Sequence, residues 1–258
     1  MNRKTKDRIK SLLIDVVDRK LSAYTPETEN MPFHFRLIGK DKYVLFSFIQ
    51  SINTAFGMSI WEQVAEILAR DKGYKVRRQV DVVNGELRGC KEQGEGKRFI
   101  YKKMRDFIDD YLTKLEKKEI EAYKDYEISM LKKRASGEKI EVPKDCADLY
   151  LEIDGKEFFI DITTSKPNLK EFKALKRKIL TWQAIRLTGD IERTPLGIVA
   201  IPYNPYHPEP YNRWTLKGLY DIENGEILIA EEFWDFVAGE KDTDFKNPTT
   251  LKYRQWQT

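Results

Sequence analysis

Histidine and cysteine are scarce in this 258-residue chain, and their scarcity excludes several kinds of active site. His34 and His207 are the only histidines, so neither a histidine-ligated metal site nor a Ser-His-Asp hydrolase is expected, and no GxSxG occurs. Cys90 and Cys146 lie in no CxxC or CxxH spacing, which argues against a structural zinc site. The phosphate-binding loops GxxxxGK[ST] and GxGxxG after a strand are also missing, so nucleotide binding through them is unsupported.

Long apolar runs are missing too. No run approaches the roughly 18 residues of a membrane span. The basic segment 1–21 has no sustained apolar stretch of the kind found in signal peptides. Two cysteines in a chain of this size fit a reducing compartment, with each as a small buried or half-buried residue. These features predict a soluble cytoplasmic protein without a membrane partner.

The chain is rich in charged residues but still has enough apolar residues to form a hydrophobic core. Charged residues make up 34% of the chain and hydrophobic residues 41%, against about 25% charged in an average domain. The net charge of +4 and the pI of about 8.8 permit nucleic-acid binding without requiring it. No segment resembles a linker, so we expect one domain over residues 1–258.

Hydrophobic periodicity predicts a mixed α/β chain around a central mixed sheet flanked by helices. Residues 41–51 are apolar and fit either a helix or a strand. Ser59 and Glu62 have the spacing of a capping box, Gly73 that of a helix C-terminus, and Asn84-Gly85 that of a turn. The expected helices are 5–22, 60–70, 169–186 and 231–238, with one or two long exposed helices as an elaboration in 98–135. The expected strands are 74–80, 147–153, 157–163, 196–202 and 226–230, with loops at 86–97 and 203–214.

The segment ADLYLEIDGKEFFIDITTSKPN, residues 147–168, carries the strongest functional signal. A two-residue Asp154-Gly155 turn sets a register in which Asp148 lies directly opposite Asp161. Two like charges in that position repel each other unless a cation lies between them. Mg²⁺ is usually held by one or two carboxylates, and phosphodiester hydrolysis needs such a cation. The alternative is that both are ordinary turn and cap residues.

Further carboxylates could join this pair. Glu62 and Glu66 are one helical turn apart, and a helix leading into the sheet could bring one of them to the metal. The alternative is a solvated helix face, with Glu62 serving only as a cap. Glu152 shares the face of Asp148 on its strand, and we interpret it as a surface residue.

Basic residues follow the acidic pair and flank the glycine-rich loop. Such clusters neutralise DNA phosphates, although a solvated helix face has the same composition. Asn and Arg suit contacts to base edges, and the 203–214 loop offers Asn204, Tyr206 and Trp214 as well. Around the acidic pair the run comprises Lys166, Lys170, Lys173, Lys176, Arg177 and Lys178, and the second cluster comprises Lys97, Arg98, Lys102, Lys103 and Arg105. The expected DNA-binding residues are Lys170, Lys173, Arg177, Arg88, Lys97, Arg98, Asn212 and Arg213.

Asp148, Asp161 and the lysine that follows resemble the PD-(D/E)xK nuclease signature, with Cys146-Ala147 before the first acid. FFIDITTSKPNLKEF is similar to the motif of TdeIII-like type II restriction endonucleases, which tends to read E-I-K-[ST]-x-K-P-N. SIWEQVAEILARDKGY resembles the N-terminal helix of that fold, and EEFWDFVAG resembles a C-terminal segment of these enzymes. The matching segments are scattered over residues 52–238.

This resemblance implies a Mg²⁺-dependent type II restriction endonuclease. Such an enzyme would cut double-stranded DNA as a homodimer at a short near-palindromic site such as GGNCC, and would be accompanied by a cognate methyltransferase. On the matching positions, Asp148, Asp161 and Glu62 would be metal ligands and catalytic groups, and Lys166 would be the second lysine of the motif.

Thr163 departs from the pattern, because the family's catalytic lysine belongs two residues after the second acid. A threonine cannot stabilise negative charge as an ammonium does. Lys166 could reach back into the site, which is the interpretation we favour. Otherwise the protein is a catalytically degenerate DNA-binding protein on the nuclease fold, or the change is specific to this chain. A structure-selective repair or Holliday-junction nuclease is a further alternative.

Overall fold

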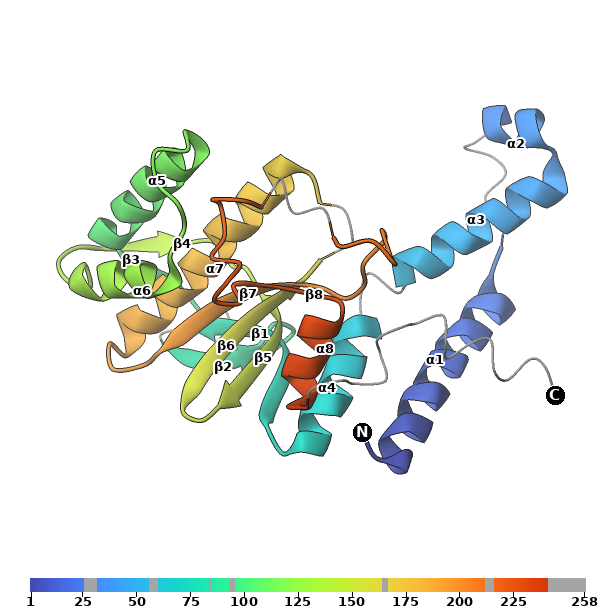
Figure 1. The fold of residues 1–258 in the computed structure, drawn as a ribbon, viewed down its shortest axis with the longest axis horizontal. Helices are drawn as coiled ribbons and strands as arrows, with labels where there is room; N and C mark the ends of the chain where they lie inside the picture. Colours follow the sequence, from blue (N-terminus) through green and yellow to red (C-terminus); the bar gives the residue numbers. More distant parts are fainter. Residues whose placement is uncertain are drawn as a thin grey trace.

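A six-stranded mixed sheet forms the centre of the computed structural model, which describes residues 1–25, 32–55, 60–83, 85–92, 96–163, 167–211 and 216–240 (Figure 1). The strand order is β2-β1-β5-β6-β7-β8. β6 pairs with β7 and β7 with β8 in parallel, and the other neighbours are antiparallel. The strands are β1 (Lys75–Val83), β2 (Glu86–Gly89), β5 (Ala147–Ile153), β6 (Lys156–Ile162), β7 (Pro195–Ile201) and β8 (Ile227–Ile229). The predicted α/β architecture is therefore confirmed.

The β5–β6 hairpin has the predicted register. Asp154 and Gly155 have φ angles of 50° and 76°, the left-handed backbone that a tight two-residue hairpin turn requires. Ile153 pairs with Lys156, and the ladder runs outward to Leu149 opposite Ile160. The next positions along this register are 148 and 161, so the two acids come from neighbouring strands.

Helices cover both faces of the sheet (Figure 1). One face packs against α7 (Leu169–Gly189), with α5 (Lys102–Glu116) and α6 (Lys124–Lys133) beyond it. The other face packs against α4 (Trp61–Lys72) and α8 (Glu231–Ala238). Asn168 and Glu171 form a capping box at the start of α7. The predicted Gly73 terminus of α4 is confirmed, with a left-handed φ of 88°.

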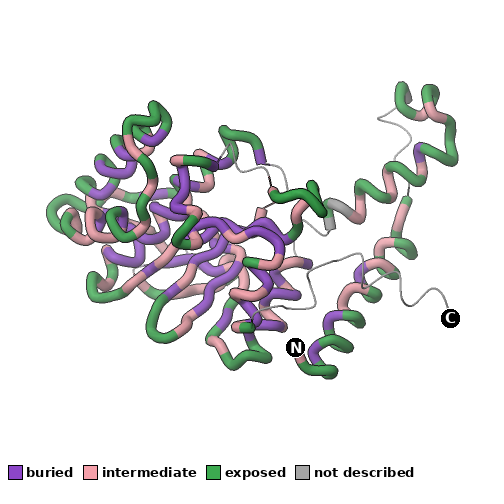
Figure 2. Tube along the Cα trace, in the orientation of Figure 1, coloured by how far each residue is buried: buried purple, intermediate pink, exposed green. Residues whose placement is uncertain are grey.

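Three N-terminal helices form an arm beside this core: α1 (Arg3–Ala23), α2 (Pro32–Ile38) and α3 (Lys40–Ala55). α1 packs against the α4 face through Ile9 and Val16. α2 and α3 project from the core and are mostly exposed, in contrast to the sheet (Figures 1 and 2). The segment 41–51, which fitted a helix or a strand, is helical. None of the described helices is long and apolar enough to cross a membrane.

Two predictions of local structure were wrong. Residues 86–89 form the edge strand β2 instead of a loop, because they pair with β1 in spite of their charged, glycine-containing composition. Residues 98–101 are the strand β3 (Arg98–Tyr101) instead of a helix, and they pair with the unpredicted β4 (Lys139–Val142). No glycine or proline separates β3 from α5, and β4 lies beyond both following helices in the chain, so no local signal marks this pairing.

The two cysteines are joined, which corrects the expectation of two separate residues. Cys90 directly follows β2 and Cys146 directly precedes β5, and the two form a disulfide. β2 and β5 are the two neighbours of β1 in the sheet, so the fold brings these strand ends together. Sequence spacing carried no sign of this contact.

Lys176 of α7 is fully buried between two acidic side chains. Its Nζ is 2.6 Å from Glu127 Oε1 and also pairs with Glu226, and all three side chains are at most 2% exposed. Tyr111 donates a hydrogen bond to Glu127 at 2.8 Å. Burial raises the pKa of Glu226 to about 7, although Lys176 acts in the opposite direction. Lys176 is thus a core residue, and the basic run predicted for DNA contact loses one member.

The buried lysine gives a stability prediction. Lys176→Met keeps the length of the side chain but leaves Glu127 and Glu226 without their cation, so we expect a loss of about 3–5 kcal/mol in the free energy of unfolding. Lys173→Met, also on α7, removes an exposed pair with Glu116 on α5 and should cost less than about 1 kcal/mol. Urea unfolding, followed by tryptophan fluorescence, measures the free energy of unfolding of both variants. An equally small loss in the two variants would contradict the assignment of Lys176 as a core residue.

Candidate active site

Asp148 and Asp161 meet at the open end of the β5–β6 hairpin. Asp161 is 6% exposed and Asp148 is half-buried. The backbone N–H of Ile162 donates to Asp148 Oδ2 at 2.8 Å. Burial, followed by the negative charge of Asp161, raises the pKa of Asp148 to about 7 in spite of this hydrogen bond. Ionising Asp148 in this buried position next to Asp161 is therefore unfavourable.

Glu62 on α4 joins this pair through Gln79. The side-chain amide of Gln79 donates to Glu62 Oε1 at 2.9 Å and to Asp148 Oδ1 at 3.3 Å. Burial raises the pKa of Glu62. The structure thus brings together three of the predicted catalytic residues, although Ser59, the predicted cap, lies outside the described residues. The other two carboxylates considered form ion pairs elsewhere: Glu66 with Arg70 and Arg78, and Glu152 with Lys75.

Gln79 has an unusual backbone for a strand residue. Its φ is 51°, a left-handed conformation that costs a residue with a side chain about 1–3 kcal/mol. Val76 packs on the α4 side of the sheet, whereas Val80 and Val82 pack on the α7 side. A regular strand would place these even-numbered residues on one face, so the alternation changes at or near Gln79. The strained residue is the one that bridges Glu62 and Asp148, and a lone glutamine gave no sequence signal.

Lys178 on α7 reaches the acids from the helix side. Its Nζ is 2.5 Å from Asp161 Oδ2 and 3.2 Å from Asp145 Oδ1, and it lies 5.0 Å from the ring centre of Trp182. Partial burial opposes its charge, but Asp161 and then Asp145 outweigh this effect and raise the pKa of Lys178. Sequence reasoning counted Lys178 only among the basic run, because a contact across 17 positions of chain has no local signal.

The sequence left open whether Lys166 replaces the catalytic lysine that the family motif has at position 163. Thr163 directly follows β6, is half-buried, and donates its backbone N–H to Ala200 O at 2.9 Å. Lys166 lies outside the described residues, as do Asn212 and Arg213.

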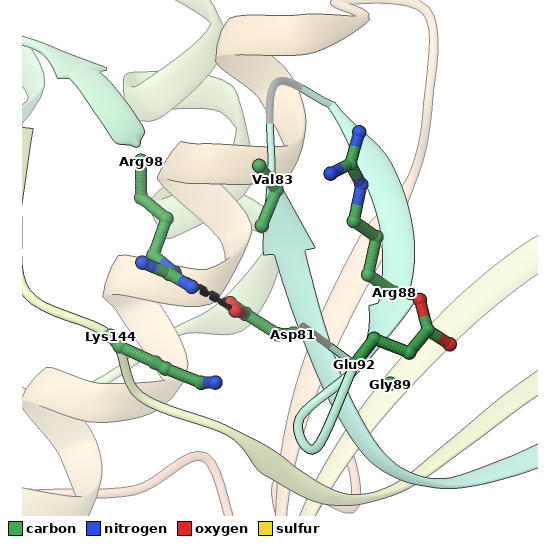
Figure 3. Close-up of a pocket in the computed structure, with 7 residues that line it drawn as sticks. All are labelled: Asp81, Val83, Arg88, Gly89, Glu92, Arg98 and Lys144. Atoms are coloured by element: carbon green, nitrogen blue, oxygen red, sulfur yellow. Dashed lines mark hydrogen bonds and ion pairs between the residues drawn. The ribbon is translucent and has the colours of Figure 1, made fainter. Parts of the chain in front are cut away.

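Most of the predicted DNA-binding side chains form ion pairs within the chain. Arg98 donates to Asp81 at 2.8 Å inside a pocket that Arg88 and Lys144 also line (Figure 3). Arg88 contacts Glu86, two residues before it on β2, at 3.3 Å. Lys170 is exposed at the start of α7. The remaining pairs are Lys97–Glu141, Lys173–Glu116 and Arg177–Asp109.

The chemistry of the acids suits a hard divalent cation. Asp148 and Asp161 offer only oxygen donors, and Mg²⁺ is commonly held by one or two carboxylates together with water. Burial, and then the neighbouring charge of Asp161, raises the pKa of Asp148, and a bound cation would favour its ionised form. Within the described ranges, however, no three His, Cys, Asp or Glu side chains form a ready-made metal cluster. The two opposed aspartates fit a metal, whereas Glu62 is held by Gln79 beside them.

Comparison with known proteins gives a consistent result. A family model described as "Type II restriction endonuclease, HinfI" matches residues 1–247. The type II restriction enzyme MjaII of Methanocaldococcus jannaschii is 27% identical over 239 residues, which cover 83% of this chain and 60% of that enzyme. The type II restriction enzyme HgiCII of Herpetosiphon aurantiacus is 24% identical over 233 residues, which cover 88% of this chain and 78% of that enzyme.

The match to MjaII thus spans less than two thirds of the length of that relative. No solved structure matches the chain. The predicted resemblance to type II restriction endonucleases is confirmed, with HinfI as the family whose model matches.

The uncompensated acids give a prediction about pH. The pKa of Asp148 rises from 3.8 to about 7 on folding, so the ionised group penalises the folded state increasingly as pH rises from about 4 to about 7. Asp148→Asn removes this penalty. Without divalent metal at pH 8 we expect a gain of about 1–2 kcal/mol, or roughly 2–8 °C in Tm.

At pH 5 the gain should be much smaller, because Asp148 of the wild type is then largely protonated. Asp106→Asn, which changes an exposed carboxylate on α5, is the matched control and should leave Tm nearly unchanged at both pH values. Differential scanning calorimetry with EDTA measures these shifts. A destabilised Asp148→Asn variant at pH 8 would contradict the electrostatic account.

Proposed function

The chain belongs to the HinfI family of type II restriction endonucleases, and we propose that it hydrolyses phosphodiester bonds in double-stranded DNA at a specific sequence. The observation that carries this proposal is the opposed pair of Asp148 and Asp161, with a lysine ammonium 2.5 Å from the second acid. Carboxylates next to a cationic side chain are the groups required to hold a metal and to stabilise a phosphate as its charge grows.

We propose Mg²⁺ as the cofactor, held by Asp148 and Asp161. When bound, the metal would supply positive charge that offsets the negative charge developing on the phosphate. The Ile162 N–H fixes one oxygen of Asp148, and Gln79 holds the other oxygen beside Glu62. These contacts fix the position of Asp148 before any substrate arrives. Glu62 would act next to the metal, as a ligand or through water.

DNA would bind through the basic side chains around this site. We propose that Arg88, Arg98, Lys97, Lys170, Lys173 and Arg177 contact phosphates, and that Asn212 and Arg213 contribute to base recognition. Several of these side chains would exchange an internal carboxylate for a phosphate on binding, at little cost because exposed ion pairs are weak. We propose a short near-palindromic site, with GGNCC as the working candidate.

We propose a homodimer whose two-fold axis matches that of the site, in which each copy cuts one strand with its own Asp148 and Asp161. We further propose that the enzyme acts in the cytoplasm with a cognate methyltransferase that protects the same sequence.

A catalytically degenerate DNA-binding protein is the second candidate, and Thr163 is the observation that favours it. A structure-selective nuclease would use the same acids but cut junctions without sequence preference. Discrete plasmid fragments would support the restriction enzyme, binding without cutting would support the degenerate protein, and cuts at junctions without a common sequence would support the structure-selective nuclease.

Plasmid cleavage tests the proposed activity. With Mg²⁺ we expect discrete fragments, and with Ca²⁺ in place of Mg²⁺ we expect DNA binding without cutting. Asp161→Ala removes one of the two proposed metal ligands and should reduce the cleavage rate at least about 100-fold. Asp106→Asn is the control and should cut normally. Full activity of Asp161→Ala would disprove the site, and binding without any cutting by the wild type would favour the degenerate protein.

The oligomeric state is a separate test. Light scattering after size-exclusion chromatography should give twice the monomer mass of 30.4 kDa. With a cognate duplex, the stoichiometry should be two chains per duplex. A single chain that cuts both strands in one binding event would contradict the dimer.

A further inference from the structure

We propose that Lys178 is the catalytic lysine of this site and takes the role that the family motif gives to position 163. This proposal rests on the proposed nuclease function. It replaces our sequence-based preference for Lys166 with a residue whose contact the structure describes.

The first argument is the position of the ammonium. Lys178 Nζ lies 2.5 Å from Asp161 Oδ2, beside the acid that the motif lysine would follow in the chain. The side chain is only 22% exposed, and it is held by Asp145 at 3.2 Å and by the Trp182 ring. Among the described residues, no other lysine or arginine forms an ion pair with either Asp148 or Asp161.

The second argument is that α7 directs its neighbouring cations Lys173, Lys176 and Arg177 to other partners. Residues of an α-helix are about 100° apart around the axis, so Lys176 and Lys178 point in nearly opposite directions. Lys176 is buried with Glu127 and Glu226. Lys173 and Arg177 pair with Glu116 and Asp109 on α5. Lys178 is thus the member of the run that the helix brings to the acids.

The third argument is that position 163, after strand β6, and position 178, on helix α7, both lie next to the carboxylate of Asp161. Thr163 is two residues after Asp161, the spacing that places successive side chains on one face of a strand. Its N–H bond to Ala200 O holds the backbone beside β7. A lysine there would approach Asp161 from the strand, whereas Lys178 approaches it from the helix above.

The reaction needs the lysine as a hydrogen-bond donor. In hydrolysis, the oxygen of a water forms a bond to phosphorus, and the ester P–O bond breaks with its electron pair on the leaving sugar oxygen. One proton leaves the water to solvent, and the leaving oxygen gains one. Lys178 would orient the water and stabilise the extra negative charge on the phosphate, and it is not consumed.

The experiment compares Lys178→Met, Thr163→Lys and the double variant, with Lys133→Met as an exposed-lysine control on α6. Plasmid cleavage with Mg²⁺ should fall at least about 100-fold in Lys178→Met. Thr163→Lys should restore the rate of the double variant at least about tenfold, because it returns an ammonium to Asp161. Lys133→Met should cut as the wild type does.

Two readouts separate catalysis from structure. Duplex binding in Ca²⁺, measured by fluorescence anisotropy, should change less than about threefold in Lys178→Met. Its Ca²⁺ affinity by calorimetry should be equal or higher, since Lys178 no longer competes for Asp161. If Lys178→Met does not fold, Lys178→Arg, which keeps the charge but not the compact ammonium, provides the same comparison.

Unchanged cleavage by Lys178→Met in a wild type that cuts would overturn the assignment. Loss of cleavage together with loss of Ca²⁺ and DNA binding, without rescue by Thr163→Lys, would make Lys178 a structural residue and would also overturn it. A wild type that never cuts would instead disprove the nuclease function, and the catalytic role of Lys178 with it.

Discussion

Repulsion between two carboxylates is the constraint on which the site depends. The two-residue turn of the β5–β6 hairpin fixes the register, and the register sets Asp148 opposite Asp161. Three groups donate to these carboxylates. The Ile162 N–H and the Gln79 amide contact Asp148, and the Lys178 ammonium contacts Asp161. The pKa of Asp148 nevertheless stays raised, first because the side chain is buried and then because Asp161 is negatively charged. A metal bound by the two carboxylates would offset the repulsion between them.

The chain contains a second buried charge cluster, and the contrast is informative. Lys176 is enclosed by Glu127 and Glu226 with no exposure to solvent, so its ammonium is committed to these two buried carboxylates. Lys178 lies two residues further along the same helix and keeps partial access to solvent. The same helix therefore contributes one lysine to the core and a second lysine to the ends of the central strands β5 and β6.

The sequence predicted what local patterns determine. The hairpin, its register, the helix after Asn168 and the Gly73 terminus all follow from turn residues, caps and periodicity. The β3–β4 pair, the Cys90–Cys146 bond and the Lys178 contact join distant parts of the chain, and nothing in the adjacent residues marks them. Gln79 was missed for a different reason, because its role depends on a left-handed backbone that no side-chain pattern reveals.

The separation of Asp161 and Lys178 onto two elements affects how such chains are found. When acid and lysine share one strand, their spacing in the sequence is fixed and a short pattern detects both. When the lysine is on a helix, the intervening segment can vary in length while the two side chains still meet. A search that demands the short pattern would discard such chains as inactive, whereas a search for an ammonium near the second acid in space would retain them.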